Sequence, residues 1–375
     1  MALTRYKLGS LIELCESKNE DLQYGIDDVK GISIQKIFIE TKADMTDVSL
    51  KPYFLVKPDD FAYVTVTSRN GEKITLAHNT TDKTYIVSSS YVVFRVKDTE
   101  HLLSDYLFIY FNRPEFDRYS RFNSWGSARE TFDWEDMCDI DIELPPLPIQ
   151  QKYVDVYNAM LANQKSYERG LDDLKLVCDA YIEDLRRKIP CEPIGPYIER
   201  HDVRNGANGT KNVMGVSTSK EFREPTSKVN RDELANYKVV KPRQISFVQT
   251  THNEKVFAYA FNNTDEDIVV TSVNEVFSTK EDKLLPEYLS MFFNRTEFDR
   301  YARFHSWGSA RETFTWDDLI KVELPIADIT VQKSISDIYT VYKKRKSINE
   351  KLKAQIKDIC PILIKGSIEE ARKGV

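Results

Sequence analysis

The sequence lacks the features of a membrane-spanning or secreted protein. None of its 375 residues falls in an apolar run that approaches the ~18 residues needed to cross a bilayer. Residues 1–20 turn acidic too early to form a secretory signal. The five cysteines are scattered and form no Cys-x-x-Cys pair, which argues against a metal site or a disulfide framework. We therefore expect a cytoplasmic protein with reduced thiols, no bound metal and no membrane contact.

The usual signatures of catalysis are also missing. We find no dinucleotide-binding G-x-G-x-x-G, no phosphate-binding G-x-x-x-x-G-K-(S/T) and no zinc-binding H-E-x-x-H. Residues 206–211 contain glycines and a lysine, but their spacing does not fit a phosphate loop. The N-P-P-(F/Y) and D-P-P-Y signatures of a methyltransferase are absent as well. The sequence therefore predicts that the chain is not an enzyme by itself.

What the sequence does contain is an internal repeat. Residues 111–136 read FNRPEFDRYSRFNSWGSARETFDWED, and residues 293–318 read FNRTEFDRYARFHSWGSARETFTWDD. About 21 of 26 positions are identical, and the offset of about 182 residues (293 minus 111) is close to half the chain. Neither chance nor secondary-structure periodicity produces such a match, so the chain is a tandem duplication.

The first copy is predicted to be a β-rich domain. Valine, isoleucine, threonine and aromatic residues dominate four short runs, at residues 32–39, 61–67, 73–77 and 85–94. Turn signals separate these runs, and Asn70-Gly71 fits a hairpin whose central residues need positive φ. Residues 104–119 then show the apolar spacing of a helix, with Ser104 as the expected N-cap.

The second copy repeats this framework more loosely. The matching segments are 8–9 with 194–195, 29–33 with 213–217, 56–58 with 240–242, and 85–94 with 268–277. The loops between them differ, and residues 204–212 have no counterpart in side-chain character near residues 18–28. A shared frame with divergent loops fits two copies of one scaffold that recognise different things.

Each copy is followed by a long helix with a heptad pattern. From Tyr153 to Leu185 the apolar positions alternate steps of four and three, with Gln164 filling the one gap. A helix over residues 149–188 would be roughly 60 Å long at about 1.5 Å per residue. Gly170 inside it costs about 1 kcal/mol relative to alanine, and the sequence alone does not explain it.

The second heptad helix runs from Ile335 to Leu363, and Pro361 is expected to kink or weaken its last turns. Two heptad helices in one chain most simply pack on each other, and a two-fold relation between the copies makes that pairing antiparallel. The alternative is that each helix buries its apolar stripe against its own domain.

The predicted fold class is α+β. It consists of a tandem pseudo-two-fold repeat of two β-rich domains, each followed by a long helix, with the helices paired as an antiparallel coiled coil. The expected boundaries are 1–148 for the first domain, 149–188 for the first helix, 189–330 for the second domain and 331–375 for the second helix.

The order of these elements resembles a known family. A β-rich domain is followed by S-W-G-S-A-R-E-T-F-x-W-(D/E)-D, by E-L-P, by a Gln-Lys step (151–152 and 332–333) and by a long helix, and the whole order then recurs. This arrangement resembles the specificity subunit of type I restriction–modification systems over essentially the whole chain. Residues 56–63 with the Arg-Asn-Gly hairpin after them also resemble the target-recognition domains of that family. The second copy departs there, because residues 243–246 replace residues 59–62 with different side chains.

The resemblance implies a DNA-reading role without chemistry. Each target-recognition domain would read one half of a bipartite, asymmetric site in double-stranded DNA. The paired helices would set the gap between the half-sites and dock two methyltransferase subunits, which carry S-adenosylmethionine. Restriction and translocation subunits, which use ATP and Mg²⁺, would cut unmethylated DNA. No cofactor is expected on this chain.

Polar loops supply the chemistry that reads bases. Arginine and lysine suit guanine, and asparagine and glutamine suit adenine. Residues 67–73 and 250–255 bring such side chains to matching places in the two copies. The residues that we expect to contact DNA are Gln35, Lys36, Thr67, Arg69, Asn70, Lys73, Arg129, Ser217, Lys220, His252, Asn253, Lys255 and Arg311. The alternative for each is an ordinary solvated turn.

The repeated block permits two interpretations. Arg129 and Arg311, together with Ser127 and Ser309, would contact phosphate, which positions a protein on DNA without specifying sequence. In the other interpretation the arginines pair with carboxylates. For the block's aromatic residues we expect hinge packing between domain and helix, and these residues are Trp125, Phe132, Trp134 and their copies.

Two other functions compete with DNA recognition. One is a stand-alone nuclease with a diverged site, which would cleave DNA without partners. The other is a protein–protein scaffold without DNA binding, which the net charge of −6 supports.

Overall fold

The computed structural model describes residues 3–41, 43–67, 73–126, 129–206, 209–226, 228–250, 256–308 and 312–374. The chain divides into two compact units. The first unit combines Met1–Ser166 with Asn349–Val375, and the second is Tyr167–Ile348. All five cysteines are free. No helix in the described ranges has a segment both long and apolar enough to cross a membrane.

In the part of the first unit that the structure describes there are ten short strands and four α-helices, joined by the end of a fifth helix, α9. The strands are β1 (Thr4–Lys7), β2 (Ile12–Leu14), β3 (Lys30–Ile32), β4 (Phe38–Glu40), β5 (Phe54–Val56), β6 (Phe61–Val64), β7 (Leu76–His78), β8 (Tyr85–Val87), β9 (Tyr91–Val96) and β10 (Asp141–Leu144). The helices are α1 (Ser104–Phe111), α2 (Pro114–Phe122), α3 (Trp134–Cys138), α4 (Leu147–Glu168) and the C-terminal part of α9 (Ile329–Lys373).

The second unit contains the same elements in the same order. Its strands are β11 (Cys191–Pro193), β12 (Ile198–His201), β13 (Gly215–Val216), β14 (Phe222–Arg223), β15 (Lys238–Val240), β16 (Ile245–Val248), β17 (Tyr259–Phe261), β18 (Ile268–Val270), β19 (Asn274–Thr279) and β20 (Glu323–Pro325). Its helices are α5 (Leu171–Lys188), α6 (Pro286–Phe293), α7 (Thr296–Phe304), α8 (Trp316–Leu319) and the N-terminal part of α9.

The sheet topology is the same in both units. A four-stranded sheet has the order β2-β9-β6-β7 in the first unit and β12-β19-β16-β17 in the second, and all its pairs are antiparallel. Three two-stranded ladders accompany each sheet, and they also correspond one to one. The predicted α+β fold with a tandem repeat is therefore confirmed. The predicted runs 32–39 and 85–94 each fold as two strands with a turn rather than as one.

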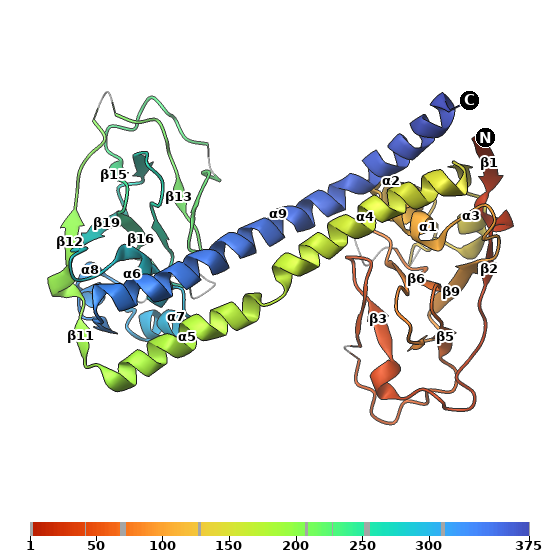
Figure 1. The fold of residues 1–375 in the computed structure, drawn as a ribbon, viewed down its shortest axis with the longest axis horizontal. Helices are drawn as coiled ribbons and strands as arrows, with labels where there is room; N and C mark the ends of the chain where they lie inside the picture. The colour runs from red at the N-terminus through yellow and green to blue at the C-terminus, as the bar shows by residue number, and fades with distance from the viewer. Residues whose placement is uncertain are drawn as a thin grey trace. The chain divides into compact units, whose positions relative to one another are not determined.

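An aromatic core holds each sheet against its helices. In the first unit Phe61, Phe94, Phe111, Phe116 and Phe132 are buried in one cluster. These phenylalanines come from β6, β9, α1, α2 and the segment after α2, so burying them joins sheet and helices into one body. The second unit has an equivalent cluster built from Phe247, Phe257, Phe277, Phe293, Phe298 and Phe314. In Figure 1 the first unit runs from red to yellow and is completed by the blue C-terminal part of α9, and the second unit runs from yellow-green to blue.

The predicted single helix over 104–119 is wrong, because it is two helices, α1 and α2. Arg113 between them is extended (φ −76°, ψ 140°), and Leu103, not Ser104, is the N-cap of α1. A proline at 114 disfavours helical geometry at Arg113. Arg295 is nevertheless extended in the same way before Thr296, so the break does not depend on proline.

The first long helix is also interrupted. The predicted helix over 149–188 divides into α4 and α5 at Gly170, whose φ of +75° is left-handed. Glycine adopts this conformation without the steric cost that other residues meet, which supplies the missing reason for it. The second long helix, α9, is continuous from Ile329 to Lys373 with Pro361 inside it.

Within each unit two helical segments run antiparallel. In the first unit Lys152 of α4 contacts Glu370 of α9 at 2.8 Å, and Gln164 Nε2 donates to Asn349 Oδ1 at 2.7 Å. In the second unit Arg345 of α9 donates to the Arg169 carbonyl at 3.2 Å. The helices also contribute to the domain cores, since Val154, Tyr157, Leu363 and Ile364 belong to the first aromatic cluster. Antiparallel pairing and packing on the domain therefore occur together.

Candidate nucleic-acid interface

One end of the main sheet in the first unit carries two neighbouring loops. Strands β6 and β7 pair with Tyr63 opposite Leu76, and the Val64 N–H donates to the Thr75 carbonyl at 3.0 Å. This pairing makes residues 65–75 the connection at the end of a hairpin, as the sequence predicts. Its predicted base-reading residues Arg69 and Asn70 lie outside the described residues.

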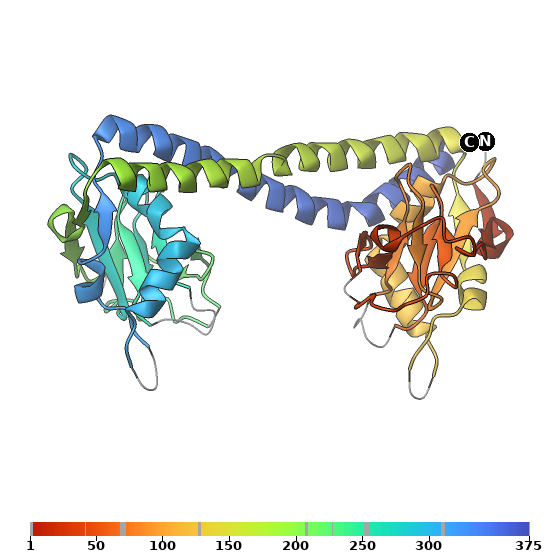
Figure 2. The same ribbon diagram turned by 90° about the horizontal axis from the view of Figure 1, so that it is seen from below.

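The second loop follows α2 and joins the first loop by backbone hydrogen bonds. The Thr67 N–H donates to the Glu130 carbonyl at 3.0 Å, and the Phe132 N–H donates to the Thr65 carbonyl at 2.9 Å. Trp125 and Thr131 exchange two backbone hydrogen bonds, at 3.1 and 3.0 Å, which close a hairpin. We call residues 122–131 the Trp hairpin of the first unit. Figure 2 shows its two limbs extending away from the body of the unit.

Local interactions fix the shape of this hairpin. Gly126 has φ of +142°, and a Cβ at that position would lie 2.1 Å from the Arg129 carbonyl oxygen, so only glycine fits. Ser124 Oγ donates to the Ser120 carbonyl at 2.6 Å, which ties the hairpin to α2. Arg121 forms an ion pair with Glu130 across its base.

The second unit builds the same arrangement. Thr250 pairs with Thr313, and the Phe314 N–H donates to the Gln249 carbonyl at 2.8 Å. Trp307 and Thr313 exchange backbone hydrogen bonds at 3.2 and 3.0 Å. Residues 304–313 therefore form the Trp hairpin of the second unit, which is also visible in Figure 2.

The Trp hairpins display aromatic side chains to solvent. Trp125 is 70% exposed and Trp307 is 73% exposed, while Phe122 and Phe304 are 80% and 78% exposed. The predicted hinge packing is therefore wrong for Trp125 and Trp307. It is right in part for the other aromatics, because Phe132 is fully buried and Trp134 packs against Phe94 with ring centroids 5.5 Å apart, although within the domain core.

A sequence signal for Phe122 exists but points only to exposure. The core residue of α2 is Phe116, and Phe122 follows six positions later. At about 100° per residue, six steps turn the side chain roughly 240° away from the buried face. The helical period therefore predicts that Phe122 faces away from the core, and it leaves the purpose of such exposure open.

Two of the predicted DNA contacts are wrong. Lys36 and Lys220 are buried, and their ammonium groups pair with Asp117 and Asp299, each at 2.8 Å. Each also donates to a backbone carbonyl, of Phe111 and of Phe293 respectively. Burial lowers the pKa of both lysines, while the paired carboxylates act in the opposite direction. These lysines hold the hairpins β3–β4 and β13–β14 against the helices and do not face a ligand.

Two hydroxyl groups in the predicted set are likewise turned inward. Thr67 is buried, and its Oγ1 donates to the Glu130 carbonyl at 3.3 Å. Ser217 is buried, and its Oγ donates to the Glu221 carbonyl at 2.8 Å. Both residues shape loops, so the structure contradicts their predicted contact with bases.

The other predicted contacts remain predictions. Gln35 is exposed in the β3–β4 turn, Arg129 is exposed in the Trp hairpin, and Lys73 is half-buried where the 65–75 connection meets β7. Glu130 joins the Trp hairpin to Thr67, so the structure brings Arg129 and the 65–75 connection to the same end of the sheet. The remaining predicted residues, His252, Asn253, Lys255 and Arg311, lie outside the described residues.

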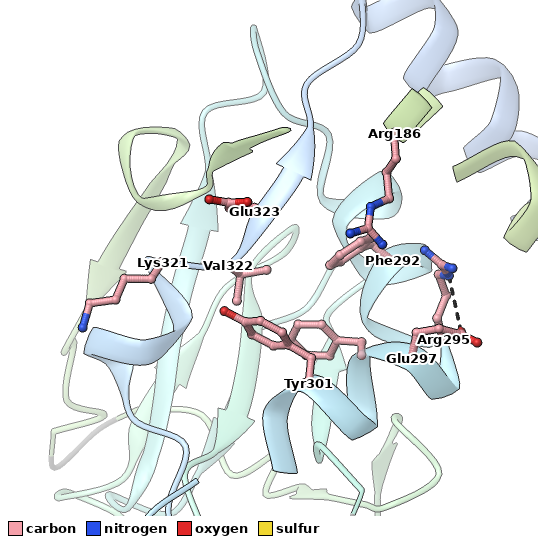
Figure 3. Close-up of a pocket in the computed structure, with 9 residues that line it drawn as sticks. Arg186, Phe292, Arg295, Glu297, Tyr301, Lys321, Val322 and Glu323 are labelled. Carbon is pink, nitrogen blue, oxygen red and sulfur yellow. Dashed lines mark ion pairs between the residues drawn. The ribbon is translucent and has the colours of Figure 1, made fainter. Parts of the chain in front are cut away.

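A pocket of about 210 Å³ lies elsewhere in the second unit. Figure 3 shows Arg186 and Arg295 on one side of it and Lys321 on the other, with Phe292 and Tyr301 between them. Three carboxylates lie within 3.7 Å of the Arg295 guanidinium, those of Asp179, Glu183 and Glu297. Because they neutralise the buried arginine, the pocket is a poor site for an anion. Among the described residues no group of three or more His, Cys, Asp and Glu side chains could hold a metal ion.

Fold and site together define a class of protein, in which one β-rich domain and its helix occur twice and each copy presents loops at the end of its sheet. A family model described as "Type I restriction modification DNA specificity domain" matches residues 6–169. This match confirms the predicted resemblance to type I restriction–modification specificity subunits over residues 6–169. The second unit repeats the strand order of the first.

A solved structure shows the same fold over nearly the whole chain. The type I restriction–modification system S subunit from M. genitalium covers 97% of this chain, and 96% of that subunit is matched, with a TM-score of 0.64 and 10% identity. The HsdS subunit from Thermoanaerobacter tengcongensis covers 98% of this chain, with 96% of that subunit matched, a TM-score of 0.39 and 14% identity. No curated protein matches the chain.

Proposed function

We propose that this chain is the DNA sequence-recognition subunit of a type I restriction–modification complex and that each unit reads one half of a bipartite site. The observation that carries the proposal is the duplication. Two units of identical strand order place non-identical connections, residues 65–75 and 249–258, at the same end of the same sheet. One frame with two different reading loops specifies two different half-sites, so the target is asymmetric.

We assign the long helices two roles, which are to space the two half-sites and to assemble the complex. The α4–α9 segments in the first unit and the α5–α9 segments in the second are antiparallel pairs attached to the domain cores. In the proposed complex they set the gap between the half-sites and dock two methyltransferase subunits. Restriction and translocation subunits join the same assembly, in the cytoplasm where the DNA is.

Catalysis is assigned to the partners. S-adenosylmethionine would be bound by the methyltransferase subunits, and ATP and Mg²⁺ by the restriction subunits. This chain would contribute the choice of sequence and would methylate nothing by itself. Because the chain has a net charge of −6, only a few positively charged side chains can contact phosphate groups. We therefore expect the affinity for DNA to fall only modestly as the salt concentration rises.

Exchanging base-reading residues in one unit at a time tests the proposal. We would co-express the full chain with its methyltransferase and sequence the methylated adenines in the host DNA. Arg69→Ala with Asn70→Ala should alter the required sequence in one half-site and leave the other half-site and the gap unchanged. His252→Ala with Asn253→Ala serves as the matched variant and should alter only the opposite half-site.

Two results would contradict the proposal. One is an unchanged target in both double variants, which would remove the loops from sequence recognition. The other is DNA cleavage or methylation by the purified chain without partners, because the proposed subunit has no chemistry of its own.

A further inference from the structure

The Trp hairpins expose more aromatic surface than the domains need. Two of the four tryptophans, Trp134 and Trp316, pack against their cores, whereas Trp125 and Trp307 stand in solvent. Phe122 and Phe304 stand beside them in sequence, at the last helical positions of α2 and α7. Large aromatic side chains held in water stabilise no fold, and a cluster of them is a common sign of a binding surface.

The described parts of the two hairpins are shaped by the same interactions. Each is closed by a pair of backbone hydrogen bonds, kinked at a glycine with left-handed φ, Gly126 and Gly308, and tied across its base by an arginine–glutamate ion pair. A flexible exposed loop would need none of these devices. These interactions fix the backbone that carries the aromatic side chains.

The exposed residues are identical in the two units, while the neighbouring loops are not. Phe122 and Trp125 recur as Phe304 and Trp307, and the sequence repeats Arg129 at position 311, whereas residues 67–73 and 250–255 differ. The adjacent loops are those to which sequence reading is assigned. A surface that is the same in both units must contact something that is the same at both half-sites.

The position of the hairpins favours DNA over a protein partner. Each Trp hairpin is hydrogen-bonded to the recognition connection of its own unit, through Thr67 and Glu130 in the first and through Gln249 and Phe314 in the second. In each unit the long helices and the described limbs of the hairpin lie at opposite ends of the domain (Figure 2). The helices are the proposed dock for the methyltransferase, so the hairpins face away from it. The exposed Arg129 gives the first hairpin a positive charge beside its aromatics.

We propose that Phe122 with Trp125, and Phe304 with Trp307, are apolar wedges that contact duplex DNA at both half-sites without reading its sequence. This inference rests on the proposed function. Aromatic side chains stack on bases or sugars of any sequence, and apolar wedges at a base step are a known means of gripping and bending a duplex. The wedges supply affinity, and the unlike loops beside them supply specificity.

The test separates affinity from specificity. The full chain in complex with its methyltransferase is titrated with a duplex that contains the target and with a scrambled duplex of equal length. Because burying one large apolar side chain contributes about 1.5–3 kcal/mol, Trp125→Ala should weaken binding to both duplexes by a similar factor, roughly 10- to 150-fold. Trp307→Ala should weaken binding likewise, the ratio between the duplexes should hold, and the methylated sequence should not change. Trp125→Phe should retain most of the affinity.

Controls guard against indirect effects. Leu14→Ala truncates an apolar side chain of β2 that is 42% exposed and lies outside both the Trp hairpins and the long helices, and it should leave DNA affinity unchanged. Thermal unfolding should be unchanged in all variants, because Trp125 and Trp307 support no core.

Three outcomes would overturn the inference. If a variant that combines Trp125→Ala with Trp307→Ala binds both duplexes as tightly as the wild type, while the loop variants still alter the target, the wedges are ruled out and the proposed function stands. Loss of methyltransferase assembly with intact DNA affinity assigns the aromatics to a protein partner instead. If the wild-type complex binds no duplex in a sequence-dependent way, the proposed function and the wedges fall together.

Discussion

The two units share their internal hydrogen bonds more closely than their sequences suggest. Gln150 at the start of α4 donates to the carbonyls of His101 and Pro145 and accepts from the Leu103 N–H. Gln332 in α9 makes the same three contacts at distances within 0.1 Å of them. These shared bonds fasten a long helix to its domain, and their repetition shows that the frame is kept by buried polar groups as much as by apolar packing.

The units differ in the charges beneath the sheet. In the first, His78 is buried between Asp59 and Asp105, each 3.5 Å away, and stacks on Phe61. In the second, Phe261 replaces the histidine on the equivalent strand, and Arg243 replaces Asp59 and pairs with Glu287 at 2.8 Å. A shared backbone therefore accepts a buried imidazole at this place in one unit and a phenyl ring beside an arginine–glutamate ion pair in the other.

The largest effect is expected from the buried lysine–aspartate pairs, which are common to both units. Lys36→Met leaves Asp117 as an unpaired, mostly buried carboxylate, and Lys220→Met does the same to Asp299. Removing one partner of a buried pair costs about 3–5 kcal/mol. Each variant should destabilise its own unit by that amount. Hydrogen exchange measured peptide by peptide at increasing urea concentration would give the stability of each unit separately.

The double variant Lys36→Met with Asp117→Leu is the control for this prediction. Because it removes both charges, it should recover part of the lost stability. A Lys36→Met protein as stable as the wild type would show that the pair does not hold the β3–β4 hairpin in place.

The buried glutamines should come next. Gln150→Glu keeps the shape of the side chain but removes two donors and points carboxylate oxygens at the His101 and Pro145 carbonyls. A buried acceptor without a partner costs about 1–3 kcal/mol. Gln332→Glu should cost a similar amount, since its surroundings are the same, and urea unfolding would measure both. If the two substitutions lowered the free energy of unfolding by different amounts, the hydrogen bonds at the starts of the two helices would not be equivalent.

Sequence reasoning reached the frame of this protein more readily than its contacts. The repeat at 111–136 and 293–318 predicts two copies of one domain, because identity over such a block has no other physical source. The sequence alone did not predict the roles of Lys36 and Trp125. The burial of Lys36 depends on Asp117, which is distant in sequence, and the exposure of Trp125 depends on a hairpin that closes only through Thr131. From residue type alone, a lysine is expected at the surface and a tryptophan in the core. The tertiary structure buries Lys36 and exposes Trp125 instead.

The buried His78, which the second unit lacks, should make the pH dependence of stability differ between the two units. Burial lowers the pKa of His78 below its ordinary value of 6.5, although Asp105 and Asp59 act in the opposite direction. The unfolded chain therefore binds a proton more readily than the folded unit, so the free energy of unfolding falls as the pH drops below about 6.5. The first unit should lose stability between pH 7 and pH 5.

His78→Phe, which installs the residue type of the second unit, should reduce that loss. Hydrogen exchange at several pH values checks this, with the second unit in the same molecule as the internal reference. An unchanged pH dependence in the first unit would mean that groups other than His78 govern it.

The smallest change in stability is expected at Gly170, where the first long helix is interrupted and the second is not. Gly170 has φ of +75°, and a Cβ there would meet no atom within 4 Å, so the backbone conformation alone resists substitution. Gly170→Ala should destabilise the second unit by about 1–2 kcal/mol, the steric cost of a left-handed alanine. Gly25→Ala is the matched control, since its Cβ would also meet open space but its φ is −102°. That change should be neutral or stabilising by about 0.4–1 kcal/mol, because it reduces the freedom of the unfolded chain. If urea unfolding gave equal values for both alanines, the junction would be able to straighten into a continuous helix like α9, and the interruption would be a preference of the sequence rather than a requirement of the fold.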